Sequence, residues 1–281
     1  MPLMSIKLIP AEKYTIEQLT DAYNQTRVDY MVPMPMNAAR LSEYIHLYDV
    51  DLNKSLVALE DGKIVGLGML AIRSDRSWIT RLGLITDQRG KGIGQALMEG
   101  LLENTDDLGI EKNILEVITG NIPAHNLFLK LGFKEQGILL ILRRAPAQLL
   151  KPPSKLYWMD RGDAVYCLNQ RPGFQAWTNQ TESLARAKGV SGFHIYTPSS
   201  GHGWIVFQRT LFNLSRLMFG TEGGDPAEIM LELLKHLHSL YPNLDTYTEN
   251  IPVDDHRLPA LKELGYFEVF RRIEMHRHPK L

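Results

Sequence analysis

The chain has 281 residues, of which 44% are hydrophobic and 22% are charged, and this composition excludes wholesale disorder. The length suits two domains, each large enough to bury its own core. Residues 1–150 carry 16 basic and 18 acidic side chains and residues 151–281 carry 15 and 14, so the halves have net charges of −2 and +1. Neither half has the basic excess of a nucleic-acid-binding protein, and we expect no nucleic-acid partner.

The cysteine content and the lengths of the apolar runs exclude further classes of protein. Cys167 is the single cysteine, so an intrachain disulfide and a metal site built on several thiolates are excluded, and no metal is expected. The first ten residues lack the apolar core of a signal peptide. The longest aliphatic run, Ile138 to Leu142, is far too short to span a bilayer. We therefore expect a cytoplasmic protein with no membrane partner; no pattern in the sequence indicates an oligomeric state.

Helix and strand patterns alternate along the first half of the chain. Asp61-Gly62 between two apolar runs predicts a tight hairpin turn. The prolines at 146, 152 and 153 mark a linker, and we place the domain boundary there, giving domains 1–148 and 149–281. The expected helices are 16–30, 37–47, 92–102 and 123–131, and the expected strands are 55–59, 63–70, 77–85, 113–118 and 138–143.

The second half repeats part of this order. Strand-like segments at 204–207 and 211–219 precede a helix that Asp225-Pro226 starts, then a strand at 246–248, a further helix and a closing strand at 267–275. Asn121-Ile122-Pro123 followed by Leu131-Gly132-Phe133 has a counterpart in Asn250-Ile251-Pro252 followed by Leu264-Gly265-Tyr266. The spacing is four residues longer in the second copy, which predicts one extra helical turn. We interpret the pattern as an internal duplication.

A glycine-rich loop joins the predicted strand 77–85 to the predicted helix that follows. It reads Arg89-Gly90-Lys91-Gly92-Ile93-Gly94-Gln95. The first amides of a helix have no partner within it, and the helix dipole makes that end partly positive. Glycines let the backbone approach an anion closely, so the loop is a predicted phosphate seat. The spacing is neither the G-x-G-x-x-G of dinucleotide sites nor a P-loop, because Gly92 stands where the P-loop has a hydroxyl residue.

The order R-x-x-G-x-G in Arg89, Gly92 and Gly94, followed by Asn121, Phe128 and Leu131-Gly132-Phe133, resembles the GNAT superfamily of acetyl-CoA-dependent N-acetyltransferases. The resemblance covers roughly residues 5–144 and is faint over the second half, where it rests on the repeat. It implies an α/β fold of tandem GNAT-like domains. Each would be a mixed, largely antiparallel sheet with helices on both faces, and the C-terminal copy would be degenerate.

The resemblance also implies where acetyl-CoA, the cosubstrate, would bind. In the family the strand before the loop splays from its neighbour and the coenzyme enters the gap; here these strands are 78–85 and 113–118. The Leu84 amide would face the thioester carbonyl. The amides from Arg89 to Gln95 would hold the diphosphate, and the Lys91 side chain would add charge or stay solvated. The coenzyme-binding residues expected on this basis are Leu84, Arg89, Gly90, Lys91, Gly92, Ile93, Gly94, Gln95, Asn121, Asn126 and Phe128.

Two residues bear on catalysis. Glu116 lies five residues before Asn121, where the similar ribosomal-protein alanine acetyltransferases have the glutamate that serves as base, so it is the candidate base; the alternative is a strand carboxylate that is paired or solvated. Phe128 stands where many family members have a tyrosine that protonates the leaving thiolate. Without that hydroxyl, water or another group supplies the proton, catalysis is slow, or the protein only binds the coenzyme.

The second copy departs further from the family pattern. Its loop reads Gly220-Thr221-Glu222-Gly223-Gly224-Asp225, and the carboxylates of Glu222 and Asp225 would repel phosphates. We therefore expect that this half does not bind coenzyme A and has a structural role or forms a wall of the acceptor pocket. The Asp245 side chain falls at the position matching Glu116 but is given no role.

These observations predict an N-acetyltransferase that moves the acetyl group of acetyl-CoA directly to a primary amine in a ternary complex. The acceptor is a small molecule or a peptide. Two alternatives stay open: a non-catalytic acyl-CoA-binding regulatory module, and an enzyme that uses a longer acyl donor. Met31, Met34 and Met36 are expected to form an adaptable apolar wall near the acceptor or to pack in the core.

Overall fold

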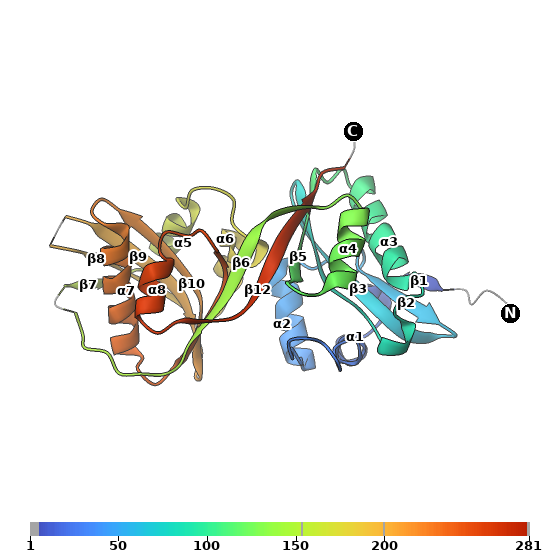
Figure 1. Ribbon diagram of the computed structural model, residues 1–281, viewed down its shortest axis with the longest axis horizontal. Helices are drawn as coiled ribbons and strands as arrows, with labels where there is room; N and C mark the ends of the chain where they lie inside the picture. The colour runs from blue at the N-terminus through green and yellow to red at the C-terminus, as the bar shows by residue number, and fades with distance from the viewer. Residues whose placement is uncertain (1–5, 153, 199, 280–281) are drawn as a thin grey trace. The chain divides into compact units, whose positions relative to one another are not determined.

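The computed structural model describes residues 6–152, 154–198 and 200–279, and the chain divides into two compact units (Figure 1). Unit 1 comprises residues 1–136 and 274–281, and unit 2 comprises residues 137–273. Relative to the predicted ranges 1–148 and 149–281, residues 137–148 lie in unit 2 and the C-terminal eight residues are assigned to unit 1. The expected roles of the two domains, acetyl-CoA binding in the first and a structural or acceptor-pocket role in the second, stay predictions.

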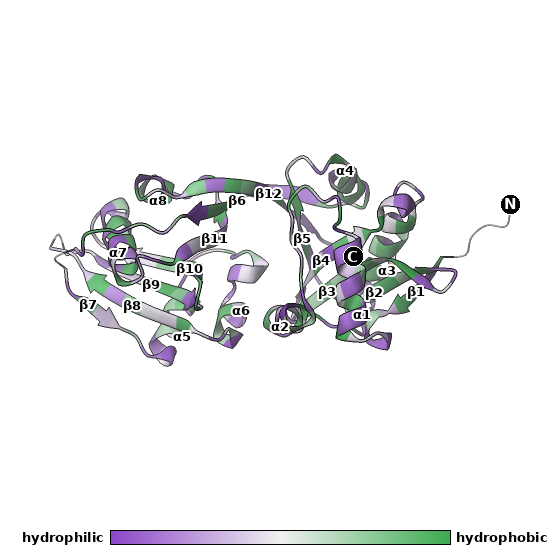
Figure 2. Cartoon of the chain, turned by 90° about the horizontal axis from the view of Figure 1, so that it is seen from below, coloured by the Kyte–Doolittle hydropathy of each residue, from purple (hydrophilic) through white to green (hydrophobic). Residues whose placement is uncertain are grey.

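Unit 1 is built on a sheet in the order β1-β2-β3-β4-β5, with the end of β12 next to β5. The pairings described among β1 to β4 are antiparallel, and β4 pairs with β5 in parallel. The β2 and β3 strands are mainly green in Figure 2, as expected of strands covered on both faces. The elements are β1 Lys7–Pro10, α1 Ile16–Gln25, α2 Ala38–Tyr48, β2 Leu56–Glu60, β3 Lys63–Arg73, β4 Arg76–Leu84, α3 Ile93–Asp107, β5 Lys112–Ile118, α4 Ile122–Lys130 and the start of β6 Lys134–Arg144.

Helices cover both faces of this sheet. A Cβ at Gly68 in β3 would lie 2.7 Å from Leu101 of α3, so the face that carries Gly68 is packed against α3. Ala71 lies three residues after Gly68 in β3 and therefore on the opposite face of the sheet. Trp78 of β4 pairs with Ala71 and shares that face. There the Trp78 ring packs on Tyr48 of α2 at 5.6 Å between centroids. Helix α1 contacts α2 and β3, and helix α3 contacts β2, β3 and β4.

Unit 2 has the sheet order β12-β6-β11-β10-β9-β8-β7. Its described pairings are antiparallel except for β10 with β11, which is parallel. The elements are β7 Leu156–Trp158, α5 Arg161–Asn169, η3 Trp177–Asn179, α6 Thr181–Arg186, β8 Val190–Tyr196, β9 His202–Arg209, β10 Asn213–Glu222, α7 Pro226–Leu240, β11 Asp245–Pro252, α8 Leu258–Glu263 and β12 Phe267–Arg277.

Two clusters of buried side chains lie on opposite faces of the unit 2 sheet. Ile205 packs with residues of α7 and α8, whereas the adjacent Val206 packs with α5 and α6 through Ala164 and Leu184. Successive residues of a strand point to opposite faces, so α7 and α8 cover one face and α5 and α6 the other. Both units are thus mixed, largely antiparallel sheets with helices on both faces, and the predicted fold class is confirmed.

The two units share their order of elements and several details of backbone geometry. After α4, Phe133 donates to the Phe128 carbonyl at 3.0 Å, and after α8, Tyr266 donates to the Leu261 carbonyl at 3.1 Å. The intervening Gly132 and Gly265 have φ of 88° and 85°, so both helices end in the same Schellman motif. The predicted internal duplication is a real structural repeat.

The sequence expectations were wrong in some local details. The four extra residues of the second copy add no helical turn: α8 has six residues against nine in α4, and the extra residues lie in the turn before α8. The strand expected at 246–248 extends over Asp245–Pro252. No element was expected between residues 157 and 203, where the structure has α5, α6 and β8. Helix α5 buries only the apolar residues Ala164 and Leu168, which are too few to give a helical pattern in the sequence.

No helix in the described part of the chain combines the length and the apolarity that a bilayer crossing requires.

His238 of α7 makes the stability of unit 2 sensitive to acid. The ring is fully buried, and its Nε2 lies 2.9 Å from the Tyr266 hydroxyl. Burial is the main cause that lowers the pKa of His238, to about 3, and the positive charge of Arg144 contributes further. Between that value and the ordinary pKa near 6.5, the unfolded chain binds the proton and the folded chain does not. The free energy of unfolding should therefore fall as the pH drops from about 6.5 towards 3, by up to about 1.4 kcal/mol per pH unit.

Urea unfolding between pH 4 and 7 measures this effect. His238→Gln should flatten the slope, whereas the same change at the exposed His256 should leave it unchanged. Equal slopes for His238→Gln and the unsubstituted protein would show that His238 does not control the acid response.

Candidate functional site

Strands β4 and β5 diverge within unit 1. They pair in parallel from Arg76 with Lys112 to Ile79 with Leu115, and in the described structure the pairing stops there. Both strands continue, β4 to Leu84 and β5 to Ile118. We call the open end between the two strands the fork of unit 1, and it lies where the sequence analysis expected the strands to splay.

A bulge in β4 coincides with the start of the fork. The register with β3 shifts between Leu67 and Met69, so that Thr80 faces Met69 and Gly83 faces Leu67. Arg81 lies in this bulge with φ of 55°, a conformation that a side chain with a Cβ rarely adopts. A bulge bends a strand and increases its local twist, which accounts for the turn of β4 away from β5.

The Leu84 amide points to the open side of the fork. The next amide, of Ile85, donates to the Val65 carbonyl in β3 at 3.0 Å, so Ile85 and Val65 form a hydrogen-bonded pair. In an antiparallel ladder such pairs alternate with pairs whose amides and carbonyls point outward. Leu84, opposite Gly66, is therefore in an outward-facing pair, on the side from which β5 has departed.

The loop after β4 leads to an uncapped helix end. A 3-10 turn, η2 Thr86–Gln88, ends with the Arg89 amide donating to the Thr86 carbonyl at 3.2 Å. Gly90 and Gly92 then adopt φ of 76° and 84°, and Gly92 precedes α3 without any side-chain cap. The first helical bond runs from Ala96 to the Gly92 carbonyl, so the amides between them have no acceptor within the helix.

The Arg89 side chain stabilises the loop through hydrogen bonds to Asp29 and Leu84. Its guanidinium donates to both carboxylate oxygens of Asp29 at 2.7 Å, and its Nε donates to the Leu84 carbonyl at 3.3 Å. The hydrogen bond from Arg89 holds the pKa of Asp29 below its ordinary value. With its amide bonded to Thr86 and its side chain bonded to Asp29, Arg89 holds the shape of the loop, and the amides from Gly90 to Gln95 remain as donors for an anion.

Two lysines flank the start of α3. Lys91, which is exposed, donates to the Gln88 side chain at 2.9 Å. Lys130 of α4 donates to Gln95 Oε1 at 2.8 Å and thereby lies next to the first turn of α3. Lys130 was not among the residues expected from the sequence; its position one helical turn after Asn126, on the same helix face, was the available signal.

The three expected residues of α4 have different surroundings. Asn121 caps the helix, its Oδ1 accepting from the Ala124 amide at 3.4 Å. Asn126 is exposed and shares a helix face with Lys130, towards the first turn of α3. Phe128 is 6% exposed and packs on Phe133 with 6.1 Å between ring centroids, so it is mainly a core residue.

Glu116 lies beside a buried phenol at the fork. Its place in β5 puts it on the face of Ile114, which pairs with Trp78 and so faces α2. Tyr44 of α2 is buried there, 2.6 Å from Thr80 Oγ1, with the Arg81 guanidinium carbon 4.2 Å from its ring centroid. Burial is the main cause that raises the pKa of Tyr44; the negative charge of Glu116 raises it further and Arg81 opposes it.

On this face, α1 and the segment that follows it contact β4 of the fork and, beyond the end of β5, Gly120. Arg27 donates to the Leu82 carbonyl at 2.8 Å, and Arg81 donates to the Tyr23 hydroxyl at 3.2 Å. A Cβ at Gly120, just past β5, would lie 3.0 Å from the Met31 methyl group, and the Met34 sulfur lies 3.9 Å from Arg81.

Within the described residues, no cluster of three or more histidine, cysteine or carboxylate side chains is placed to hold a metal ion.

Alanine at Gly92 in the loop and at Gly94 in the first turn of α3 should change the stability of the protein with opposite signs. Gly92→Ala should destabilise the protein by about 1 kcal/mol, because alanine at φ of 84° is strained although the space is open. Gly94 has an ordinary helical φ, and a Cβ there would lie 3.5 Å from Leu84, a normal contact; Gly94→Ala should stabilise by about 0.5–1 kcal/mol. Thermal unfolding of the two variants tests this, and a destabilised Gly94→Ala would contradict the geometry.

Comparisons with known proteins agree with this architecture. Residues 16–133 match the model of the acetyltransferase (GNAT) family. An uncharacterized N-acetyltransferase of Mycobacterium tuberculosis is 34% identical over 104 residues, which are 36% of this chain and 64% of that protein. The chain thus spans about 64% of the length of this relative.

Two solved structures resemble the whole chain. A GCN5-related N-acetyltransferase of Sphaerobacter thermophilus matches with a TM-score of 0.74 and 14% identity, over 98% of this chain and 97% of that one. A tandem GNAT protein from the clavulanic acid biosynthesis pathway matches with a TM-score of 0.67 and 14% identity, over 99% and 100% of the two chains. The chain has the tandem GNAT fold, and its residues 16–133 match the model of the acetyltransferase (GNAT) family.

Proposed function

We propose that unit 1 binds acetyl-CoA at its fork and transfers the acetyl group to a primary amine. One observation carries this proposal: the diverging strand β4 ends in a loop that leads directly to an uncapped helix N-terminus. The fork offers outward-facing backbone groups, and the helix start offers several unpaired amides at the positive end of its dipole. A ligand with a diphosphate at one end and an extended amide-bearing arm matches both features.

The diphosphate would accept hydrogen bonds from the amides of Gly90 to Gln95. Lys91, which is bonded to Gln88, and Lys130, which is bonded to Gln95, would add positive charge. Asn126 lies on the same face of α4 as Lys130 and would contact the coenzyme nearby, whereas the Asn121 side chain serves first as the cap of α4. Gly94, which has no side chain in the first turn of α3, would let the ligand approach the backbone.

In the chemical step the amine nitrogen attacks the thioester carbonyl. The N–C bond forms, the C–S bond breaks, and coenzyme A leaves as the thiolate. The outward-facing Leu84 amide would stabilise the oxyanion that develops on the carbonyl. Glu116 would accept the proton of the attacking amine, directly or through water. Because Phe128 has no hydroxyl, water would protonate the thiolate.

The acceptor would enter from the face of α1 and α2. Met31 and Met34 supply flexible apolar surface there, and Glu116 supplies a carboxylate for the incoming ammonium group. This arrangement suits a small molecule or a peptide end that carries a primary amine next to an apolar group.

A turnover assay tests the proposal. The purified protein is incubated with acetyl-CoA and a panel of primary amines that includes amino acids, polyamines and short peptides, and the release of free thiol is followed. Release that depends on the amine supports acetyl transfer; no release across the panel, with acetyl-CoA bound, would contradict it.

Glu116→Gln should lower kcat at pH 7 by about 100-fold or more, the usual contribution of a general base, while coenzyme binding stays intact. The loss should shrink as the pH rises, because the free amine then becomes abundant without help. Glu103→Gln is the matched control, since Glu103 is an exposed glutamate on α3 outside the fork. An unchanged rate for Glu116→Gln would remove Glu116 from the mechanism.

A second candidate is a non-catalytic module that binds acyl-CoA and regulates a partner. The buried Phe128 in place of a proton-donating hydroxyl favours it. Calorimetry combined with the turnover assay separates the two functions, because a module binds acetyl-CoA without consuming it. Comparing acyl chain lengths in the same assay decides whether acetyl or a longer group is the donor.

A further inference from the structure

Unit 2 contains a counterpart of the fork. Strands β10 and β11 pair in parallel only at Asn213 with Asp245 and Leu214 with Thr246 within the described structure, although β10 continues to Glu222 and β11 to Pro252. Arg216 lies in the β10 bulge with φ of 53°, as Arg81 does in β4. Each arginine comes two residues after the last ladder pair, so the bulge and the divergence are both repeated.

This geometric match also corrects the sequence alignment of the two copies. Counting from the last ladder pair, Glu116 of β5 corresponds to Tyr247 of β11, not to Asp245. Asp245 instead accepts from Arg143 of β6 at 3.0 Å. The second fork therefore has no carboxylate at the position of the candidate base.

The helix start in unit 2 is already occupied by an anion. Where Gly92 leaves α3 uncapped, Asp225 caps α7, and its carboxylate accepts from the Ala227 amide at 2.9 Å. Pro226 at the first helical position has no amide to offer. The Asp225 carboxylate thus holds the place that a phosphate would take in unit 1.

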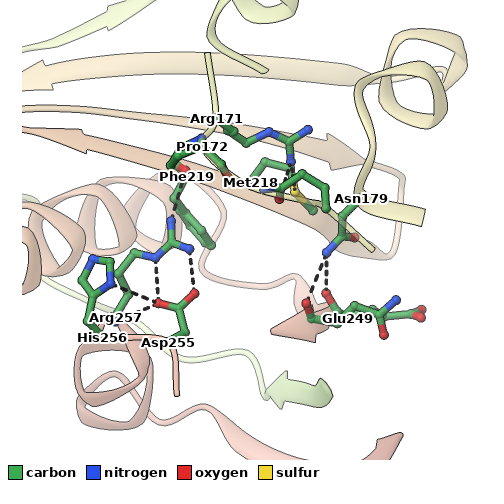
Figure 3. A network of polar contacts seen from close by, with 11 residues as sticks. Arg171, Pro172, Asn179, Met218, Phe219, Glu249, Asp255, His256 and Arg257 are labelled. Atoms are coloured by element: carbon green, nitrogen blue, oxygen red, sulfur yellow. Dashed lines mark hydrogen bonds and ion pairs between the residues drawn. The ribbon is translucent and has the colours of Figure 1, made fainter. Parts of the chain in front are cut away.

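The second fork is bridged by the unit's own chain. The segment 171–180 connects α5 to α6, and Figure 3 shows it reaching both strands. Arg171 donates to the Met218 sulfur of β10 at 3.0 Å, and Asn179 Nδ2 donates to the Glu249 carbonyl of β11 at 3.0 Å. In addition, Asn250 Nδ2 of β11 donates to Thr178 Oγ1 at 3.0 Å.

The bridge contacts β11 and α6 within unit 2 through η3, and the side chains of η3 are buried. Trp177 is fully buried, and Thr178 and Asn179 are each 7% exposed. Arg257 adds a further contact from the turn before α8, donating to the Phe219 carbonyl at 3.1 Å while it is paired with Asp255 (Figure 3). Phe219 stands three residues after Arg216, as Leu84 stands three residues after Arg81, so this bond holds the equivalent point of the strand.

We propose that unit 2 is a self-occupied copy of the cosubstrate site, in which Asp225 takes the place of the phosphate and Asn179 takes the place of the ligand arm on β11. The inference rests on the proposed function, in which unit 1 binds acetyl-CoA at its fork. It implies that the full chain binds one molecule of coenzyme A and that unit 2 keeps its fork in shape without any ligand.

Calorimetric titration of the full chain with coenzyme A tests the stoichiometry. One equivalent should bind, and Gly92→Asp, which gives α3 the carboxylate that α7 already has, should abolish it. Asp225→Asn, which keeps a capping side chain but removes the charge, should leave one equivalent because segment 171–180 still fills the second fork. Two equivalents per chain, or one equivalent left in Gly92→Asp, would overturn the proposal.

Hydrogen exchange tests self-occupancy independently of coenzyme binding. Asp225→Ala should speed exchange of the Ala227 amide about fivefold, the loss expected for an average helix cap. Asn179→Asp, an isosteric change that presents an acceptor to the Glu249 carbonyl, should speed exchange in β11 while β2 and β3 stay protected. Unchanged exchange in both variants would show that these side chains do not hold the site. Changed exchange with no coenzyme bound by the unsubstituted protein would instead refute the proposed function of unit 1 alone.

Discussion

The structure depends on the divergence of two parallel strands in each unit. A strand that leaves its neighbour exposes amides and carbonyls that the ladder would otherwise satisfy, and such groups need partners. The bulges at Arg81 and Arg216 create this situation at equivalent points, each with the left-handed backbone of a non-glycine residue. Conformations of this kind persist only where the surrounding structure holds them, and they gather at functional sites.

The two units meet the same requirement by different chemistry. In unit 1, Arg27 and Arg89 satisfy the carbonyls of Leu82 and Leu84, while the start of α3 stays uncapped behind two glycines of positive φ. In unit 2, Arg257 binds the Phe219 carbonyl of β10, Asn179 binds the Glu249 carbonyl of β11, and Asp225 caps the helix. A duplicated fold can thus keep its architecture while one copy keeps a place for a ligand and the other fills it.

Much of the fold and part of the site could be predicted from the sequence. The loop from Arg89 to Gly94 was visible because glycine and arginine at fixed spacing report backbone conformation directly, and the repeat was visible because both helices end in the same leucine–glycine–aromatic signal. The Arg81 bulge and the Tyr44–Thr80 contact were not, since each depends on register or on packing between elements distant in sequence. Helices α5 and α6 were missed because they are short and bury few apolar residues.

The most direct test of the account is a crystal structure of the full chain with coenzyme A. The account predicts the diphosphate within hydrogen-bonding distance of the amides between Gly90 and Gln95, with the thiol arm between β4 and β5 and no coenzyme at α7. Coenzyme bound elsewhere, or a fork of unit 1 closed by its own side chains as in unit 2, would contradict it.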